Sequence, residues 1–368
     1  MTARVPIARR QLLADRRRSA LAIAGVGLAL LLALTLQGIF AGATRQVTRY
    51  IRTNPADVIV SQAGVRTMHM SSSALDAGVA DQVRILDGVA WAEPIRYSSA
   101  VLTVEDASLL AYVIGAHRSD HGGATDLVAG RQPGRDQAVV DRVAADSLGI
   151  EIGDTITLTG RDVEIVGLTR GLTSVANTTV FVDWTWFDGA PPAYLLVKAR
   201  SGTTPQALAE TVRAALGPNV EVQTRNQFAS SEAAVVADMS SDILRIMSGV
   251  AFAIAVAVIA LATYTATVAR LRDVAVLKAL GAPTRRLAAV TVTQSAWTVA
   301  VAVAVAVMGT AALGWIIPNL NPAVDIALTP NAVRNAVAAG VGAALIGAVT
   351  PLLRVAAVDP STAFGRAT

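Results

Sequence analysis

Four long segments without a single charged side chain constrain the fold of this chain more than any other feature. They span 19–42, 246–269, 287–317 and 335–353, which are 24, 24, 31 and 19 residues. A helix rises about 1.5 Å per residue, so about 20 residues cross the roughly 30 Å hydrocarbon core of a bilayer. We therefore predict a polytopic α-helical membrane protein with four transmembrane helices, at 19–42, 243–269, 287–317 and 335–353.

The composition agrees with this class. Only 16% of the residues are charged and 53% are hydrophobic, whereas soluble domains contain about 25% charged residues. The first apolar segment is longer than the roughly 7–15 residues of a secretory signal, so we expect an uncleaved anchor. Residues 1–18 place arginines around a weak apolar stripe, which fits either a cytoplasmic amphipathic helix on the inner membrane surface or a simple charge cluster that sets topology.

The distribution of basic residues predicts the orientation, because cytoplasmic connections are rich in Lys and Arg. Six arginines precede the first segment, and the connection at 270–286 contains five basic residues. The outer loop expected at 318–334 has none before Arg334. We therefore predict a cytoplasmic-membrane protein whose N-terminus and whose tail, 354–368, are cytoplasmic, with residues 43–242 outside.

The net charge of +4 conceals two opposite populations. Residues 43–242 contain 16 Lys and Arg against 23 Asp and Glu, a net of −7, and the rest of the chain contains 15 against 4, a net of +11. The basic residues thus follow the topology, and we expect no nucleic-acid partner. The chain has no cysteine, so the outer domain must be stable without disulfides.

Strand and helix patterns alternate in the outer segment and predict an α+β domain of two strand-helix-strand halves. A small β-rich insert is expected between them at about 126–188, with one short helix over 139–150. From 227 to 245 a helical pattern continues into the second apolar segment, and such a stiff link transmits movement. The other expected elements are strands at 56–62, 193–199 and 220–224, helices at 75–86 and 204–217, and a strand pair over 97–116 that turns at Glu105 and Asp106.

Motifs for catalysis or cofactor binding are not found. A phosphate-binding loop needs Gly-Lys-Ser/Thr, and neither lysine, Lys198 or Lys278, stands in that context. His117 and His121 are four residues apart, which makes them weak metal candidates, but Gly122 and Gly123 follow and no third ligand stands at defined spacing. We expect a chain that is not an enzyme and binds neither a metal nor a cofactor of its own.

The basic connection "RLRDVAVLKALGAPTRRL", residues 270–287, has a pattern of its own. Val274, Leu277 and Gly281 recur at helical spacing, so an apolar stripe flanked by charges can enter a groove of a partner. Gly281 allows the helix to end, and Pro283 stops its continuation. The alternative is a charged turn that only fixes topology.

This stretch, extended to "RLRDVAVLKALGAPTRRLAAVTVTQS", resembles the cytoplasmic signature of the FtsX-like/MacB-type permeases of ABC transporters. Asp273 stands where the family usually has Glu, and Gln294 stands where Glu often begins the next helix. The segments "ARRQLLADRRRSALAIAGVGLAL", "AVVDRVAADSLGIEIGDTITLTGRDVEIVGL" and "PLLRVAAVDPSTAF" are similar to the family's start, outer β insert and end. The resemblance covers essentially the whole chain.

The resemblance implies a permease that forms a homodimer and pairs with two copies of a separate ATPase subunit, which binds the ATP and Mg. It implies export or efflux of a substrate by mechanotransmission at the outer face of the membrane, in contact with membrane lipid. An extracytoplasmic adaptor, a lipoprotein or a hydrolase are further partners that it allows. The alternative function is an FtsX-type regulator of a cell-wall hydrolase without transport. The residues that would contact the ATPase are Arg272, Asp273, Leu277, Lys278, Leu280, Gly281, Ala282 and Arg286.

Overall fold

The structure, a computed structural model, describes residues 16–69, 71–105, 107–174, 177–268 and 284–357. The chain divides into two compact units. The helical unit contains the chain up to Ala41, Ser240–Leu320 and the chain from Asp325. The α+β unit contains Gly42–Met239 and Asn321–Val324.

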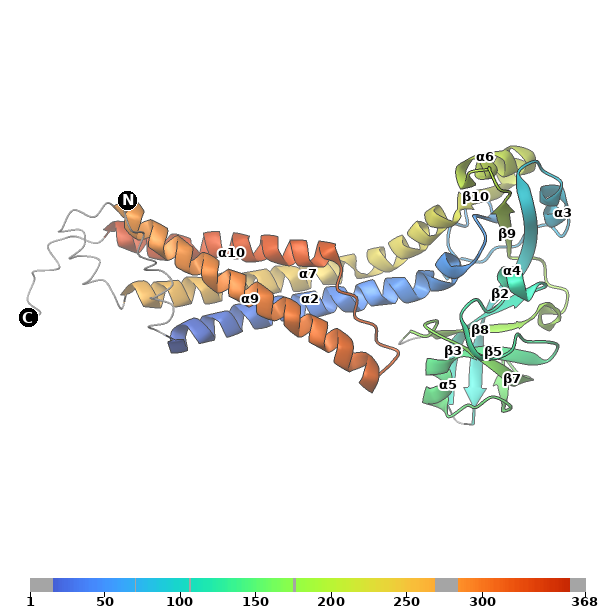
Figure 1. Ribbon diagram of the computed structural model, residues 1–368, viewed down its shortest axis with the longest axis horizontal. Helices are drawn as coiled ribbons and strands as arrows, with labels where there is room; N and C mark the ends of the chain where they lie inside the picture. The colour runs from blue at the N-terminus through green and yellow to red at the C-terminus, as the bar shows by residue number, and fades with distance from the viewer. Residues whose placement is uncertain (1–15, 70, 106, 175–176, 269–283, 358–368) are drawn as a thin grey trace, which may run out of the picture. The chain divides into compact units, whose positions relative to one another are not determined.

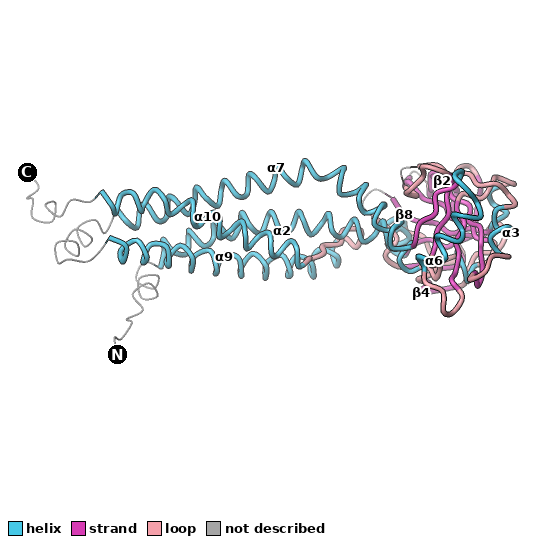
Figure 2. The backbone as a smooth tube through the Cα atoms, turned by 90° about the horizontal axis from the view of Figure 1, so that it is seen from above, coloured by secondary structure: helices cyan, strands magenta, loops and turns pink. Residues whose placement is uncertain are grey.

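Long helices that lie side by side make up the helical unit (Figures 1 and 2). Two of them extend into the residues of the α+β unit, because one ends at Thr53 and another begins at Arg225. The continuous helical pattern predicted from 227 into the second apolar segment is therefore confirmed. The helices are α2 (Arg16–Thr53), α7 (Arg225–Val268), α9 (Thr284–Leu320) and α10 (Pro330–Ala357).

Three of the described helices are long and apolar enough to cross a membrane. The spans lie at Ala20–Thr53 in α2, Arg245–Ala262 in α7 and Ser295–Leu320 in α9. The fourth predicted segment, 335–353, falls within α10, several of whose side chains lie outside the described residues. The total of four transmembrane helices stays a prediction.

Small residues bring these helices close together, as is typical of packing in membranes. A Cβ atom added at Gly25 of α2 would lie 3.0 Å from Cγ1 of Val258 in α7, and one at Gly340 of α10 would lie 2.8 Å from Cγ1 of Val299 in α9. The buried apolar residues include Val26, Leu30, Leu34, Ala255, Ile259, Val299, Ala302, Ala306, Ala336 and Ala343.

Ten strands of the α+β unit form one sheet in the order β10-β1-β9-β2-β3-β8-β5-β7-β4, and β6 pairs with β2 and β7. The strands are β1 (Val58–Gln62), β2 (Val89–Val104), β3 (Ala107–Ala116), β4 (Leu127–Gly130), β5 (Gln137–Asp141), β6 (Thr155–Leu158), β7 (Arg161–Thr169), β8 (Asn177–Asp183), β9 (Tyr194–Ala199) and β10 (Val220–Thr224). The short helices are α3 (Val79–Arg84), α4 (Ser119–Gly122), α5 (Arg142–Leu148), α6 (Pro205–Leu216), η1 (Trp184–Phe187) and η2 (Gly217–Asn219).

In the first part of the sheet, β10, β1, β9 and the first half of β2 pair antiparallel. Helices α3 and α6 pack against it and close a core that includes Leu195, Leu208 and Val83. The sequence specifies α6 locally: the side chain of Thr204 accepts a hydrogen bond from the Ala207 N–H, and the helix ends at Leu216, followed by Gly217, whose φ is +73°. The two predicted strand-helix-strand halves thus share one sheet.

The second part of the sheet is rich in β structure and contains β3 to β8, with α5 as its helix (Figure 1). Two of its pairings are parallel, β3 with β8 and β5 with β7. The predicted turn at Glu105 and Asp106 falls between the antiparallel strands β2 and β3, although Asp106 itself is not described. A core separate from that of the first part fills this region.

Two predicted helices were too long. The helix predicted over 139–150 begins only at Arg142, because Val139 and Val140 are fully buried in β5, where β-branched side chains pack well. The helix predicted over 75–86 spans only Val79–Arg84. The expected first turn does not form, because the Leu75 N–H instead donates to the Pro192 carbonyl at 2.8 Å.

Candidate functional site: the helix anchors of the α+β unit

Most residues predicted to contact an ATPase lie outside the described residues, namely Arg272, Asp273, Leu277, Lys278, Leu280, Gly281 and Ala282. Arg286 lies in the first turn of α9, which begins at Thr284. The structure therefore does not test the predicted coupling segment, and it stays a prediction.

The two weak metal candidates are both described. His117 follows β3 and is exposed, with its ring 6.3 Å from that of Trp184. His121 lies in α4, where its ring stacks on Trp91 with the centroids 4.1 Å apart. Within the described ranges, no three His, Cys, Asp or Glu side chains come together as a metal site.

The structure does bring together side chains that fix α2 and α7 into the α+β unit. We call them the helix anchors: Tyr50 on α2, Asn54 immediately after it, and Arg225, Phe228 and Glu232 on α7. Phe228 and Glu232 are one helical turn apart, so both point to the same side of α7, and each is no more than 1% exposed. The carboxylate thus occupies a position that an apolar side chain would normally take.

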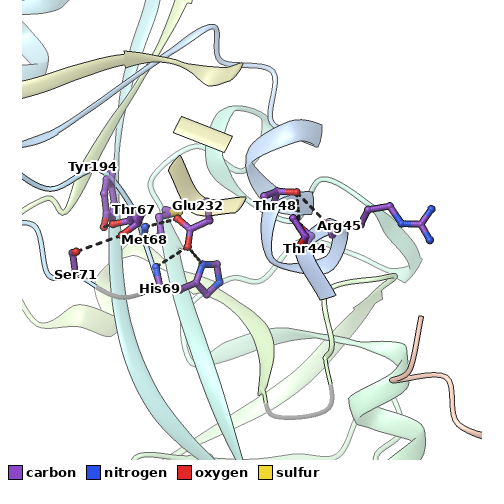
Figure 3. Close-up of polar contacts among 9 residues, drawn as sticks. All are labelled: Thr44, Arg45, Thr48, Thr67, Met68, His69, Ser71, Tyr194 and Glu232. Atoms are coloured by element: carbon purple, nitrogen blue, oxygen red, sulfur yellow. Dashed lines mark hydrogen bonds and ion pairs between the residues drawn. The ribbon is translucent and has the colours of Figure 1, made fainter. Parts of the chain in front are cut away.

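Three hydrogen bonds compensate for the burial of Glu232 (Figure 3). Its carboxylate accepts from the Met68 N–H at 2.7 Å, from the His69 N–H at 3.2 Å and from Nδ1 of the His69 ring at 2.6 Å. A buried carboxylate is stable only when its oxygens have such donors, and hydrogen bonds to charged groups are stronger than neutral ones. The segment between β1 and α3 is therefore fastened to α7.

Aromatic rings hold the same segment from the side of the sheet. The His69 ring meets Tyr112 of β3 edge-on, with the centroids 4.5 Å apart. The Tyr194 hydroxyl of β9 donates to the Thr67 carbonyl at 3.0 Å, as Figure 3 shows. Burial raises the pKa of Tyr97 and of Tyr194, and the nearby charge of Glu232 raises both pKa values further. These hydroxyls therefore stay protonated.

The last turns of α2 are anchored in a similar way. The buried Tyr50 hydroxyl donates to the Gly122 carbonyl at 2.8 Å. Asn54 is 1% exposed; its side-chain oxygen accepts from the Ala56 N–H at 2.9 Å, and its amide donates to the His121 carbonyl at 3.3 Å. Within α2 itself, the Thr48 hydroxyl donates to the Thr44 carbonyl at 2.8 Å (Figure 3).

The two anchored helix ends are also joined to each other. Arg225, the first residue of α7, donates from Nη1 to the carbonyl of Asn54 at 2.9 Å and from its backbone N–H to the carbonyl of Asp57 at 2.8 Å. The loop between α9 and α10 also contacts α2, because Gln46 Nε2 donates to the Ala323 carbonyl at 3.2 Å. A displacement of either helix end would therefore reach the other.

A cavity of about 20 Å³ lies among Gln46, Tyr50, His69, Tyr97 and Tyr112. This volume suits about one water molecule. The Tyr97 hydroxyl is buried and has no hydrogen-bond partner among the described residues, so it is available to such a water. The anchors thus pack closely around a space that suits a single water molecule.

Sequence reasoning missed the helix anchors. Glu232 and His69 are 163 positions apart, and no local pattern connects them. One signal in the sequence pointed to them: Glu232 follows Phe228 by four positions in a helical segment. This spacing places a charged residue on the apolar side of the helix.

Comparison with known proteins places the two parts of the chain in known families. Residues 19–215 match the model of the MacB-like periplasmic core domain, and residues 245–360 match the FtsX-like permease C-terminal domain. Uncharacterized ABC transporter permeases from Mycobacterium bovis and from Mycobacterium tuberculosis strain H37Rv are each 26% identical over 358 residues, which is 95% of this chain and 96% of the relative. A second permease of strain H37Rv is 25% identical over 359 residues, again 95% and 96%.

Two solved structures also resemble part of the chain. The periplasmic region of MacB from Actinobacillus actinomycetemcomitans is 15% identical, with a TM-score of 0.38, and the match covers 49% of this chain and 94% of that one. The extracellular domain of the transporter YknZ from Gram-positive bacteria is 12% identical, with a TM-score of 0.37, and the match covers 46% and 99%. The match to the MacB-like periplasmic core domain covers more than half of the chain. The chain therefore belongs to the MacB-like, FtsX-like family of ABC transporter permeases.

Proposed function

We propose that the chain is the permease subunit of an export-type ABC transporter, driven by a separate ATPase and acting by mechanotransmission. Movement imposed on the membrane helices from the cytoplasm would change the position of the α+β unit and so move a substrate at the outer face of the membrane. The observation that carries this proposal is the set of helix anchors, whose buried side chains fix both α2 and α7 into the α+β unit through hydrogen bonds.

The strength of the anchors supports transmission. A buried polar group that loses its partner costs about 1–3 kcal/mol, and more when it is charged. Pulling α7 away from the segment at 67–69 would break three such bonds to Glu232 at once. Moving the α+β unit together with the helix ends therefore costs less free energy than breaking the hydrogen bonds between them.

At the cytoplasmic side, the proposed movement would begin at the predicted coupling segment, residues 270–286. We propose that Arg272, Asp273, Leu277, Lys278, Leu280, Gly281, Ala282 and Arg286 form the contact with the ATPase, whose two copies bind the ATP and Mg. Two copies of the permease would form the membrane part. The absence of a phosphate-binding loop around Lys198 and Lys278 supports a separate ATPase subunit.

The orientation proposed here follows the basic residues, with both termini cytoplasmic and the α+β unit outside. The relatives are described as transporter permeases, which supports transport over the alternative of a regulator of a cell-wall hydrolase. An adaptor or lipoprotein that binds the α+β unit would define the substrate further.

Coupling to the ATPase can be tested with the full permease and its ATPase in nanodiscs. In the double variant Leu277→Asp, Gly281→Trp, we expect the permease to lose the ATPase in affinity purification and to lose its effect on the rate of ATP hydrolysis. Leu320→Asp, at the opposite end of α9, is the matched control and should retain both. An unchanged hydrolysis rate and unchanged co-purification in the double variant would contradict the proposal.

A further inference from the structure

The helical unit contains a groove whose lining includes none of the helix anchors. Its volume is about 360 Å³, within the range of pockets that take small ligands. Residues of three helices line it: Leu30, Ala33 and Gln37 of α2, Arg245, Ser248, Ala251 and Phe252 of α7, and Asn335, Ala336 and Ala339 of α10.

The lining changes from apolar to polar along the groove. Gln37 lies two turns after Leu30 on α2, and Arg245 lies two turns before Phe252 on α7. Gly25, near the start of α2, faces Val258, near the end of α7, and the end of α2 and the start of α7 both belong to the α+β unit. The two helices therefore run antiparallel, and both polar residues are at the same end. These two turns correspond to about 10 Å of helix. The groove therefore has an apolar stretch with a polar end.

The start of α10 lies at this same end. The Ala327 N–H, just before α10, donates to the carbonyl of Gly38 at 2.9 Å, next to Gln37. Asn335 follows in the second turn of α10 and adds a side-chain amide. Three helices thus each bring a polar side chain to one end of a groove whose remaining lining is apolar.

These polar groups are available to a ligand. The side chains of Gln37, Ser248 and Asn335 make no hydrogen bond with the described residues. Arg245 pairs with Asp242 at 3.1 Å, but both side chains are mostly exposed, where such a pair contributes about 0–1 kcal/mol. The guanidinium has five N–H donors, so several stay free for an anion.

We propose that the groove binds an anionic phospholipid of the bilayer, with its phosphate at Arg245, Gln37 and Asn335 and an acyl chain along Ala33, Ala251 and Ala339. The part of α7 that lines the groove belongs to a segment long and apolar enough to cross a membrane, so lipid would surround it. A polar side chain without a partner is costly inside a bilayer, and a lipid headgroup supplies hydrogen-bond acceptors to it. Arg245 is the only charged residue of the lining, and because its exposed pair with Asp242 is weak, its guanidinium favours an anionic headgroup over a zwitterionic one.

The test is lipid binding to the purified full-length permease, measured by native mass spectrometry with added phosphatidylglycerol or phosphatidylcholine. One basic residue contributes about 1 kcal/mol to binding of anionic lipid, which is about fivefold in affinity. Arg245→Gln should therefore weaken phosphatidylglycerol binding about fivefold, whereas binding of phosphatidylcholine, whose choline offsets the charge of its phosphate, should weaken less. Arg334→Gln removes an equivalent charge next to Asn335, outside the groove, and should have no effect.

A second pair of variants tests the apolar part. Ala339→Phe fills the groove and should remove the bound lipid, whereas Ala338→Phe places the same ring on the exposed side of α10 and should not. Equal losses in Arg245→Gln and Arg334→Gln, or retention of lipid in Ala339→Phe, would overturn the proposal. So would a disulfide between two copies in Ser248→Cys, since it would place a second copy in the groove. None of these readouts depends on an ATPase.

Discussion

The carboxylate of Glu232, on the helix that continues into a membrane span, accepts a hydrogen bond from the ring of His69 at 2.6 Å. Two backbone N–H groups, of Met68 and His69, point to the same carboxylate. The pair joins the start of α7 to a segment that the sheet holds through Tyr112 and Tyr194. A small side-chain cluster thus connects a membrane helix to the centre of the α+β unit.

Replacing Glu232 by Gln should loosen this connection. The amide nitrogen of glutamine cannot accept a hydrogen bond, so at least one buried N–H of Met68 or His69 loses its acceptor, at about 1–3 kcal/mol. Amide exchange of the segment 66–69 should then become roughly 5- to 150-fold faster, as measured by hydrogen–deuterium exchange of the full permease. Glu210→Gln on the exposed face of α6 is the control, and equal exchange in both variants would contradict the role of Glu232.

On α2, we expect Tyr50→Phe to weaken the second anchor. The variant keeps the buried ring and removes the hydrogen bond from the hydroxyl to the Gly122 carbonyl, which costs about 0.5–1.5 kcal/mol. Exchange of the α4 amides should rise accordingly. In Tyr112→Phe the lost hydroxyl has no hydrogen bond with the described residues, so this variant should exchange as the wild type does, and the hypothesis fails if the two variants behave alike.

Glu93 makes the stability of the α+β unit depend on pH, and the sign of this dependence can be predicted. Burial raises the pKa of this carboxyl, and the charges of Arg84, His117, His121 and Arg118 oppose the rise without cancelling it. A carboxyl with a raised pKa in the folded state stabilises the fold most at a pH below its ordinary pKa. This contribution disappears as the pH rises through the raised pKa, because the unfolded state loses the proton first.

The measurement is the exchange protection of the β2 amides around Glu93 from pH 4 to 7, corrected for the intrinsic rate of exchange. Protection should fall as the pH rises, by at most about 1.4 kcal/mol per pH unit. Glu93→Gln has no titrating proton, so its protection should stay level over the same range. A wild-type profile that rises with pH would show that the sign is wrong.

In the helical unit, Gly340→Leu should separate α10 from α9. Already the first side-chain atom would lie 2.8 Å from Val299 and 3.3 Å from Val303, and such overpacking costs about 1–3 kcal/mol. The midpoint of thermal unfolding in detergent should fall. Gly249→Leu adds the same side chain where no heavy atom lies within 4 Å, and it should leave the midpoint unchanged or raise it, because leucine favours helix. Equal midpoints would disprove tight packing at Gly340.

Features with local causes were predictable from the sequence. Thr204, Pro205 and Gly217 specify the two ends of α6 by capping, and the structure confirms both. The apolar segments are long enough to define α2, α7 and α9 without knowledge of their neighbours. The family, too, could be identified from motifs, since the matches to both domain models confirm the resemblance.

Features that depend on distant residues were not predictable. The parallel pairing of β3 with β8 joins residues 67 positions apart and leaves no periodic signal in either strand. The predicted first turn of α3 is absent because Leu75 pairs with Pro192 instead. The helix anchors also depend on distant residues. The buried charge of Glu232 is explained only by the hydrogen-bond donors of Met68 and His69.

Hydrogen–deuterium exchange of the full permease with its ATPase in nanodiscs measures whether movement reaches the α+β unit from the cytoplasmic side. With ATP held by a hydrolysis-deficient ATPase, we expect changed exchange of the amides at 42–54 and 225–239 relative to the nucleotide-free complex. The double variant Leu277→Asp, Gly281→Trp should abolish this change. If ATP alters only the helical unit of the wild-type complex and leaves the amides of the α+β unit unchanged, transmission through the helix anchors is contradicted.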